Sequence, residues 1–447
     1  TLVAFFCVCG TISERRTKGL SNATHPVDDF HGKTTTSPNR RLAESDEDYK
    51  KTIQSHLKMF KSPPEARVIG PSSFPKPSDK AKKSSDEEVV VALKPTLGQH
   101  RPNQDAVVMF AAEYGISVYS QFIESLRGSG YEGDIVLSVH KNDLENQEIM
   151  DYLGYYANGR GVVVYTPKQV CYTKEQEAVD SANGGARTCK LHEVYGKKQA
   201  DGTVQTIEDP RDSRTLQNLR YEVYWAMIAT YNPNSWMLLV DARDTVFQDD
   251  PFAHVPRNTD PTGESGLLYF FGESAEASNI GKSAKFNFRW IRSAYGIEIA
   301  NAVSEKPIIC SGATMGEAIA IETYLRAMVA EADETGTVLV GSDQGFHNRL
   351  FYSNKLANAD RIHAIVVFDQ GTGIVNNLAA LRSKELPEWG NGKVMEKTNS
   401  GEYKVNNWDG SISPVVHQFD RHKELGRYFS RTKGKRDYQN WRQHKKT

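Results

Sequence analysis

Short continuous apolar runs alternate with periodic apolar stripes along the chain from about residue 104 onwards. Continuous runs are typical of buried strands, whereas apolar residues at every third or fourth position indicate amphipathic helices. Strand-like runs lie at 106–112, 134–139, 161–165 and 236–240, and helical stripes at 117–126 and 214–231. Strands that alternate with helices predict an α/β fold built on a parallel sheet with right-handed crossovers.

The pattern before residue 104 is different. The first residues are apolar and lead into a basic stretch at 15–18, which is typical of the clipped end of a signal or membrane anchor, although a spanning helix needs about 20 apolar residues. Residues 19–103 are rich in Ser, Pro, Lys, Asp and Thr, a composition that cannot bury enough apolar surface to fold alone. We interpret residues 1–18 as the remnant of such a segment, with its orientation left open, and 19–103 as a disordered stem or linker.

Residues 104–430 are predicted to form one large globular domain. Within it, residues 166–212 break the rhythm with Gly, Lys and Asp and are interpreted as an insertion. The basic residues of 431–447 predict a solvated tail. Asn22-Ala-Thr24 is a glycosylation sequon, which is usable only if the stem enters the secretory pathway.

The net charge and the cysteine content limit the binding partners and the cellular compartments that are expected. The net charge is -1, so no global field attracts nucleic acid or membrane, and no nucleic-acid partner is expected. Five cysteines are few for a disulfide scaffold. Cys171 and Cys189 flank a loop-like segment and are either bridged in an oxidising compartment or two free thiols, while Cys310 is expected in the core.

Two carboxylates follow the most apolar of the predicted strands. The run Trp236-Met-Leu-Leu-Val240 ends in Asp241 and Asp244. Ligands of open α/β sheets bind outside the carboxyl ends of the strands, and hard oxygen ligands suit Mg²⁺ or Mn²⁺ carrying a phosphorylated substrate. Alternatively, Asp241 caps the next turn and Asp244 pairs with a basic residue such as Arg243.

The spacing of these acids separates two chemistries. Phosphatases of the haloacid-dehalogenase type need Asp-x-Asp after the strand, with the first Asp as nucleophile and the second as acid. Here the two acids are three positions apart, as Asp241-Ala-Arg-Asp244, which rotates the second carboxylate away in a tight turn. Nucleotide-sugar transfer requires only that the motif hold a metal and a ribose, so this spacing favours transfer.

The chain resembles GT-A-fold glycosyltransferases over residues 104–430, especially the glycogenin-like family and its bacterial sugar-transferase relatives. Leu238 to Phe247 is similar to their apolar strand with Asp-x-Asp, with one residue inserted, so the main metal ligand of the two acids stays open. The resemblance implies a GT-A-type, Rossmann-like mixed, mostly parallel sheet flanked by helices. It also implies that Arg220, on the helix before the acidic motif, contacts donor sugar or phosphate.

Later motifs follow in the order of that family. Ser311 and Gly312 resemble the small-residue turn against which the donor lies, because close approach needs residues without bulk. Ala111, at the end of the first strand, belongs to the same donor-binding set. Asp343 and Gln344 match the catalytic pair at a helix start, where the Asp binds sugar hydroxyls and the Gln lies near the anomeric carbon. The alternative for Asp343 is an ordinary helix N-cap.

A final motif completes the expected site. His417 and Lys423 have the family's six-residue His-to-Lys spacing, although the intervening Gly and the following Pro-Trp are missing. The resemblance makes His417 the third metal ligand and Lys423 the charge that neutralises the departing diphosphate. His422 is a competing candidate. One imidazole among oxygen ligands fits Mn²⁺ or Mg²⁺ better than Zn²⁺.

Together these motifs predict a metal-dependent glycosyltransferase that moves a sugar from a nucleoside-diphosphate donor to an unknown glycan, protein or lipid acceptor, with retention of configuration. We expect it at the lumenal side of the Golgi or another secretory-pathway membrane, with a possible anchor before Thr1. The alternatives are a phosphatase or nucleotidyltransferase that uses the acidic turn, and a catalytically inactive carbohydrate-binding protein. Acceptor specificity is expected in 166–212 and 285–292, unless Phe286, Trp290 and Ile291 are simply the buried side of a helix.

Overall fold

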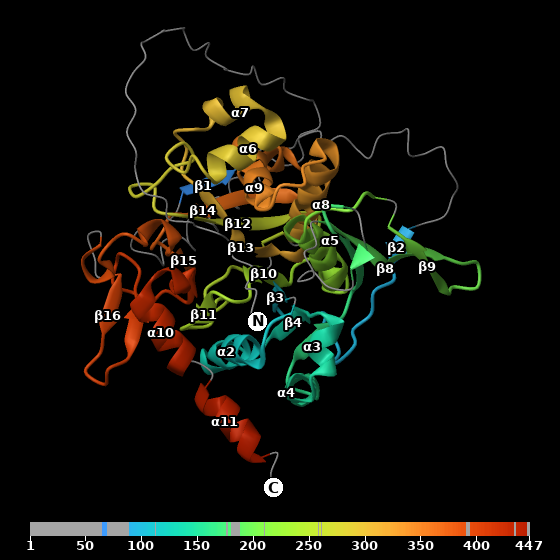
Figure 1. The fold of residues 1–447 in the computed structure, drawn as a ribbon, viewed down its shortest axis with the longest axis horizontal. Helices are drawn as coiled ribbons and strands as arrows, with labels where there is room; N and C mark the ends of the chain where they lie inside the picture. Colours follow the sequence, from blue (N-terminus) through green and yellow to red (C-terminus); the bar gives the residue numbers. More distant parts are fainter. Residues whose placement is uncertain are drawn as a thin grey trace.

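The structure is a computed structural model (Figure 1). It describes residues 65–68, 89–111, 113–175, 178–179, 188–209, 211–257, 259–260, 262–389, 394–432 and 435–444. The expectations for residues 1–18 and for the sequon at Asn22 therefore lie outside the described residues. Among the residues that are described, no helix combines the length and apolar character needed to cross a bilayer.

A large central sheet organises the molecule, with the strand order β1-β14-β12-β13-β10-β3-β4-β5 (Figure 1). Its strands are β1 (Glu65–Val68), β3 (Ala106–Phe110), β4 (Asp134–Ser138), β5 (Val162–Tyr165), β10 (Trp236–Asp241), β12 (Gly266–Gly272), β13 (Ile309–Glu317) and β14 (Ile362–Phe368). Only β13 and the edge strand β1 run against the others. The predicted fold class, an α/β protein with a mixed, mostly parallel sheet, is confirmed.

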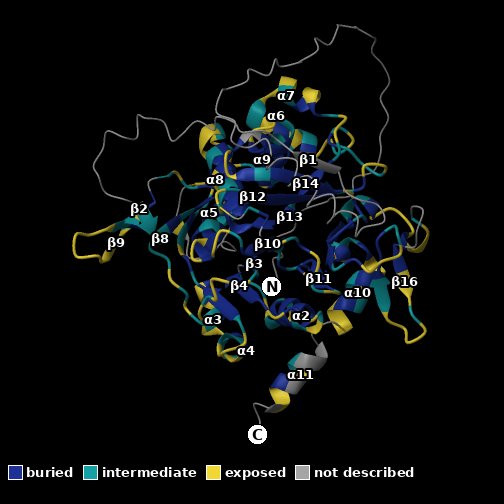
Figure 2. Cartoon of the chain, turned by 180° about the vertical axis from the view of Figure 1, so that it is seen from behind, coloured by how far each residue is buried: buried dark blue, intermediate teal, exposed yellow. Residues whose placement is uncertain are grey.

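Helices cover both faces of this sheet, and others pack against the small sheet or against neighbouring helices. They are α2 (Ile116–Gly128), α3 (Lys141–Glu145), α4 (Gln147–Ala157), α5 (Leu216–Ile228), α6 (Asn287–Tyr295), α7 (Ile297–Ala302), α8 (Ala318–Thr335), α9 (Ser342–Tyr352), α10 (Lys423–Thr432) and α11 (Lys435–His444), with the 3-10 turns η2 (Leu356–Asn358), η3 (Ala379–Leu381), η4 (Leu386–Glu388) and η5 (Phe419–Arg421). Val107 and Met109 pack with α2 and α4, whereas Ala106 and Val108 pack with α5 and α8. Successive side chains of a strand alternate between faces. Because both faces are covered, the central strands β3, β5, β10 and β12 are largely apolar and buried (Figure 2).

A small sheet lies beside the carboxyl end of β10. It contains β11 (Thr245–Phe247), β18 (Val415–His417) and β15 (Val375–Asn377), in the order β11-β18-β15. β11 follows β10 after a tight turn and pairs antiparallel with β18, so that Thr245 lies opposite His417. A hairpin of β16 (Met395–Lys397) and β17 (Tyr403–Val405) packs nearby in the same cluster of apolar residues. This pairing places His417, from the last predicted motif, beside the acidic turn at 241–244.

The predicted insertion at 166–212 folds as a sheet of its own. Its strands are β6 (Lys168–Tyr172), β7 (Ala178–Val179), β8 (Thr188–Lys198) and β9 (Val204–Glu208), joined at one edge by β2 (Val89–Val91). Cys171 and Cys189 are direct cross-strand neighbours in β6 and β8 and form a disulfide. Of the two alternatives that the sequence leaves open, the bridged one is therefore observed. Cys310 is a buried free thiol, as expected.

Packed structure also occurs outside the predicted domain boundaries. From the range interpreted as a stem, β1 and β2 join sheets and Leu97 forms a bridge with Val164. Val89-Val90-Val91 is apolar enough to pair at an edge that the insertion leaves open. At the other end, Trp441 of α11 is 6% exposed and contacts Tyr152 edge-on, which differs from the solvated tail that its charges predict because the aromatic residues of α11 pack inward.

Candidate metal centre

Three ligand-type side chains converge where the central sheet meets the small sheet. Asp241 ends β10, Asp244 closes the turn before β11, and His417 ends β18. The backbone amide of Gln418 donates to the carbonyl of Asp244 over 2.7 Å, which ties the end of β18 to that turn. One ligand atom from each of the three side chains lies within 4.8 Å of the others. The structure therefore brings together all three residues that the sequence proposes as metal ligands.

The imidazole of His417 occupies a position suited to a metal ligand. Its Nε2 lies 3.8 Å from Oδ2 of Asp241 and 3.7 Å from Oδ1 of Asp244. Among the described residues this buried atom has no hydrogen-bond partner. A buried polar atom without a partner is costly and requires an explanation such as a missing ion. Two carboxylate oxygens and one imidazole nitrogen fit Mn²⁺ or Mg²⁺ with open positions for a substrate.

Gly312 gives this centre its space. A Cβ at residue 312 would lie 2.4 Å from Cε1 of His417 and 2.8 Å from Oδ2 of Asp241. These separations are far below a normal contact, so no other residue fits here without moving the ligands. The sequence predicts that a donor approaches the backbone closely at Gly312, and that stays a prediction; the crowding at this glycine comes from His417 and Asp241.

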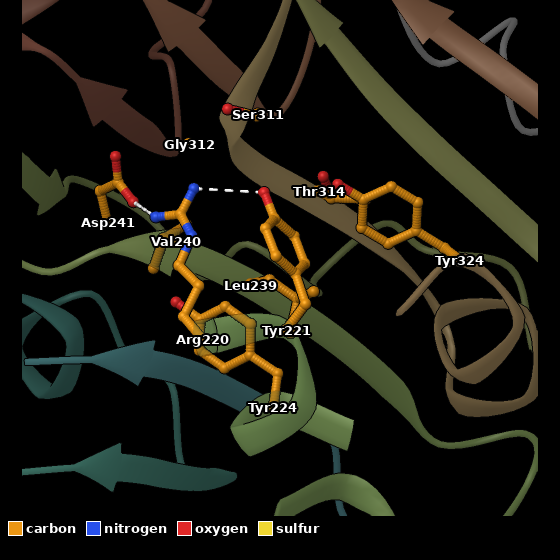
Figure 3. Close-up of a pocket in the computed structure, with 10 residues that line it drawn as sticks. All are labelled: Arg220, Tyr221, Tyr224, Leu239, Val240, Asp241, Ser311, Gly312, Thr314 and Tyr324. Carbon is orange, nitrogen blue, oxygen red and sulfur yellow. Dashed lines mark hydrogen bonds and ion pairs between the residues drawn. The ribbon is translucent and has the colours of Figure 1, made fainter. Parts of the chain in front are cut away.

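Arg220 connects the metal cluster to the predicted catalytic pair. From α5 its guanidinium contacts Oδ1 of Asp241 and donates to Oδ2 of Asp343 over 2.8 Å. Figure 3 shows this arginine with Tyr221 on one side and Asp241 on the other, in a narrow pocket bordered by Ser311 and Gly312. Asp241 thus uses one oxygen for Arg220 and keeps the other toward His417. The hydroxyl of Ser311 lies 3.4 Å from Oδ2 of Asp343.

Burial and charge set the protonation of these acids. Burial alone would raise the pKa of Asp241, but Arg220 and His417 outweigh it and hold that pKa below its ordinary value. Burial raises the pKa of Asp244, with the Asp241 charge adding to the effect and His417 opposing it. Burial likewise raises the pKa of Asp343 against the opposing charge of Arg220. The charge of Asp241 opposes the ionisation of Asp244, and a divalent cation between the two acids would favour the charged form of both.

Asp343 and Gln344 make different contacts in the structure. Both lie in the first turn of α9, as predicted, but Gly341 is the N-cap, so the alternative of an ordinary cap does not apply to Asp343. The Oε1 of Gln344 accepts from the amide of Ser311 over 2.7 Å, and its Nε2 donates to the carbonyl of Ile309 over 2.6 Å. Gln344 therefore holds the start of β13, and with it Ser311, against α9.

The basic residues near the cluster differ from the motif. Lys423 is exposed at the first position of α10, and no described contact joins it to the metal ligands. Instead Nη2 of Arg421 lies 3.5 Å from Oδ2 of Asp244. Asp420 pairs with both Arg421 and Arg243, so the basic residue that the alternative expects beside Asp244 is Arg421 and not Arg243. His422 points elsewhere, with Nε2 2.9 Å from the carbonyl of Leu378, which leaves His417 as the histidine of the cluster.

The remaining predicted residues take more distant positions. Ala111 is buried just after β3, and its amide donates to the carbonyl of Ser138. In the register of the sheet, the residue before it, Phe110, is the partner of Asp241. In the predicted acceptor segment, Ile291 is fully buried, and a Cβ at Gly341 would lie 2.4 Å from the ring of Trp290. The segment at 285–292 therefore packs on the start of α9, beside Asp343.

Other groups at the centre were not found from the sequence. Burial raises the pKa of Tyr114 to about 12, and the charges acting on its hydroxyl are those of Arg243, Asp241, Asp244 and Arg220. Burial also raises the pKa of Glu273 to about 7, against Arg382 and Arg421. Glu273 directly follows the apolar strand β12, which is the same signal that singled out Asp241. For Tyr114, no sequence signal distinguishes it from other loop tyrosines.

Comparison with known proteins adds only distant likenesses. No protein-family model and no curated protein matches the sequence. The apo structure of the WbbM bifunctional glycosyltransferase aligns with 12% identity and a TM-score of 0.33 over 61% of this chain and 39% of that chain. A UDP-glucose phosphorylase from Trypanosoma brucei aligns with 9% identity and a TM-score of 0.27, over 72% of this chain and 76% of that chain. A mutant UDP-glucose pyrophosphorylase from Leishmania major in complex with UDP-glucose aligns with 10% identity and a TM-score of 0.28, over 83% and 84%.

Likenesses at this level assign no family. The chain spans about two fifths of the length of the WbbM chain. The function is therefore inferred from the residues of the centre itself.

Proposed function

We propose that this protein is a metal-dependent glycosyltransferase that uses a nucleoside-diphosphate sugar. The observation that carries the proposal is the buried Nε2 of His417, which has no hydrogen-bond partner among the described residues and lies within 3.8 Å of two carboxylates at the carboxyl edge of the sheet. Carboxylates paired with one neutral imidazole hold Mn²⁺ or Mg²⁺, and those ions bind phosphates. That edge is also where open α/β sheets bind their ligands.

The surrounding charges fit the cleavage of a sugar diphosphate. A bound Mn²⁺ or Mg²⁺ supplies Lewis-acid stabilisation of the negative charge that develops on the leaving diphosphate. Arg421 and Arg243, held by Asp420 beside Asp244, add fixed positive charge on the same side. We assign the diphosphate to this side and keep Lys423 as a second, more exposed candidate for that charge.

Arg220 and Asp343 form the opposite wall of the centre. The guanidinium of Arg220 neutralises Asp241 and Asp343 together, so Asp343 is a fixed acceptor for sugar hydroxyls rather than a mobile surface acid. Gln344 keeps Ser311 and Gly312 in place beneath the donor. Retention of anomeric configuration remains part of the proposal, and the anomeric proton couplings of the product measured by NMR would test it.

Titration calorimetry with UDP, GDP and ADP, with and without Mn²⁺, tests the proposal. We expect one nucleoside diphosphate to bind only in the presence of Mn²⁺, and Asp241→Asn to abolish that binding. A screen of the matching nucleotide sugars, scored by slow hydrolysis without acceptor, should then identify the donor. Release of phosphate alone, or a requirement for a nucleoside triphosphate, would identify a phosphatase or nucleotidyltransferase instead. Binding without any turnover would identify an inactive relative.

We further propose that the protein works inside the secretory pathway. The disulfide between Cys171 and Cys189 supports this, because such bonds persist in oxidising compartments and are rare in the cytosol. Protease protection in intact microsomes, together with mobility of the non-reduced and reduced protein on gels, checks both points. Digestion of the catalytic domain without detergent would contradict a lumenal location.

A further inference from the structure

Asn377 joins the two sheets that form the metal centre. It ends β15, where its backbone is the partner of His417 in β18. Its Nδ2 donates to the carbonyls of Phe271 and Gly272 at the end of β12, each over 3.1 Å. Its Oδ1 lies 2.8 Å from Nδ1 of His417. The side chain is fully buried, so each of these contacts is made without competition from water.

These contacts determine which way the amide of Asn377 faces. The oxygen and nitrogen of an amide are distinguished by their hydrogen-bond partners. Two backbone carbonyls can only accept, so the NH₂ group must face Phe271 and Gly272. The oxygen is then left for His417. Because that oxygen can only accept, Nδ1 of His417 must carry the proton, and Nε2 of the neutral ring is left with its lone pair.

Without Asn377 the surroundings favour the opposite tautomer. Nε2 of His417 faces the two carboxylates of Asp241 and Asp244, which attract a proton to that nitrogen. On the other side, the thiol of Cys310 lies 3.7 Å from Nδ1 and can donate weakly to it. An Nε2–H ring would direct its proton at the place where the cation should bind.

We propose that Asn377 is a positioning residue for the metal: it holds His417 in the Nδ1–H tautomer, so that the Nε2 lone pair faces Asp241 and Asp244. This inference rests on the proposed metal-dependent function and adds the element that makes the histidine a ligand. Partners that orient a ligating histidine typically change metal affinity by about 10- to 100-fold when they are removed.

The first test uses the protein without metal. Long-range ¹H–¹⁵N spectra of protein with labelled histidine rings distinguish the two tautomers, at a pH above the ordinary His pKa of about 6.5. The signal of His417 among the 12 histidines is assigned by its loss in His417→Gln. We expect an Nδ1–H ring in the wild type and an Nε2–H ring in Asn377→Ala. An Nε2–H ring in the wild type, or an unchanged tautomer in Asn377→Ala, overturns the proposal.

The second test measures Mn²⁺ affinity by calorimetry in matched variants. Asn377→Ala should bind Mn²⁺ about 10- to 100-fold more weakly. Asn376→Ala is the control: Asn376 is the preceding residue, equally buried, and its amide bonds to Gln370, Asn406 and Ser413 rather than to His417. It should lose stability but keep the wild-type Mn²⁺ affinity and tautomer. Equal loss of affinity in both variants would show a general structural effect and overturn the proposal.

If Asn377→Ala does not fold, a third variant tests whether the residue at 377 sets the tautomer of His417. Asn377→Asp keeps an oxygen acceptor for Nδ1–H, although a carboxylate faces the two carbonyls less favourably and should lower the thermal midpoint. It should retain the Nδ1–H tautomer and bind Mn²⁺ at least as well as the wild type. A shift of its proton to Nε2 overturns the proposal. If the wild type binds no Mn²⁺ at all, the proposed function fails, while the tautomer measurement still decides the role of Asn377.

Discussion

Buried and half-buried acids lie at both ends of the parallel strands, and their surroundings differ. At the amino ends, Asp134 is fully buried and its oxygens accept from Nε of Arg101 over 2.6 Å and from the hydroxyl of Tyr231 over 2.6 Å. Asp105, just before β3, forms a two-pronged pair with Arg257 over 2.8 and 2.7 Å. At the carboxyl ends, Asp241 and Asp244 also have an arginine beside one oxygen, but the other oxygen of each faces a histidine nitrogen that has no partner among the described residues.

The comparison shows what separates a structural acid from a site. An acid whose oxygens already accept from cations and hydroxyls has its charge compensated by the fold. At the carboxyl end, Arg220 and Arg421 compensate one oxygen each of Asp241 and Asp244, while the other oxygens and Nε2 of His417 face one another at a place that a cation would fill. The difference is visible only in the contacts, because all of these acids are short side chains next to apolar strands.

The largest effect should come from exchanging one acid at each end. Asp244→Asn removes a charged ligand, so we expect Mn²⁺-dependent turnover to fall by about 1000-fold, equivalent to several kcal/mol of lost charge stabilisation. Asp134→Asn should lower the free energy of unfolding by about 2 to 3 kcal/mol through its charged hydrogen bonds, with Mn²⁺ affinity unchanged. Calorimetry and thermal unfolding of both variants measure these outcomes. A loss of metal binding in Asp134→Asn would contradict the distinction between structural acids at the amino ends and metal ligands at the carboxyl ends.

Glu317 tests whether a lone buried acid behaves like the cluster. It lies at the amino ends of the parallel strands, where Thr259 and the amide of Leu267 donate to one of its oxygens. Burial raises its pKa to about 7. The folded pKa exceeds the ordinary 4.5, so the neutral carboxyl favours folding fully at low pH, and this contribution is lost as the pH rises through 7.

Replacing this acid by its neutral amide should therefore remove one component of the pH profile. Above pH 7 we expect Glu317→Gln to unfold with a free energy about 3 kcal/mol higher than that of the wild type, with little difference near pH 5. Urea unfolding across the pH range measures it. If the free energy of unfolding depends on pH in the same way in both proteins, folding does not raise the pKa of Glu317.

Two glycines of β13 allow the same contrast to be tested with small substitutions. Gly312→Ala forces a Cβ against His417 and Asp241, which we expect to weaken Mn²⁺ binding by about 2 kcal/mol, or about 30-fold. A Cβ at Gly316 would instead lie 2.5 Å from the carbonyl of Leu267. Gly316→Ala should therefore destabilise the sheet but leave Mn²⁺ affinity in the folded protein unchanged. Similar metal affinities for the two variants would argue against crowding at the centre.

The smallest effect concerns the positive charge beside the cluster. Because Arg421 lies at Asp244, we expect Arg421→Gln to lower turnover by about tenfold, or about 1.4 kcal/mol, with Mn²⁺ affinity nearly unchanged. Lys423→Gln is the matched control and should have little effect on turnover. Steady-state kinetics of both variants show which of the two residues stabilises the leaving diphosphate. A larger defect in Lys423→Gln would assign that role to Lys423, as the sequence motif predicts.

Much of the fold follows from local patterns. The predicted strands at 106–112, 134–139 and 236–240 correspond to β3, β4 and β10, because a strand covered on both faces must be apolar throughout. The ends of the packed chain were harder to predict. β2 and α11 contain only a few apolar residues each, and their burial depends on the partners that the rest of the fold presents to them.

The candidate site divides in the same way. Asp241 was found because it directly follows an apolar run, Asp244 because it lies in the same acidic turn, and His417 because its spacing to Lys423 resembles a family motif. Asn377 and Arg421 carry no such mark. Whether Asn377 reaches His417 depends on β15 pairing with β18, and that pairing joins residues far apart in the sequence.

The alternation of strands and helices, the acidic turn after β10 and the type of ligand atoms available can be read from the sequence, because these depend on the chemistry of neighbouring residues. Only the tertiary structure decided that His417, and not His422, faces the acids, that Arg421 lies beside Asp244, and that Cys171 is bridged to Cys189. The physical reason is that hydrogen bonds and ion pairs act over a few ångströms in space. Which side chains come within that range is set by strand pairing across the whole chain rather than by distance along it.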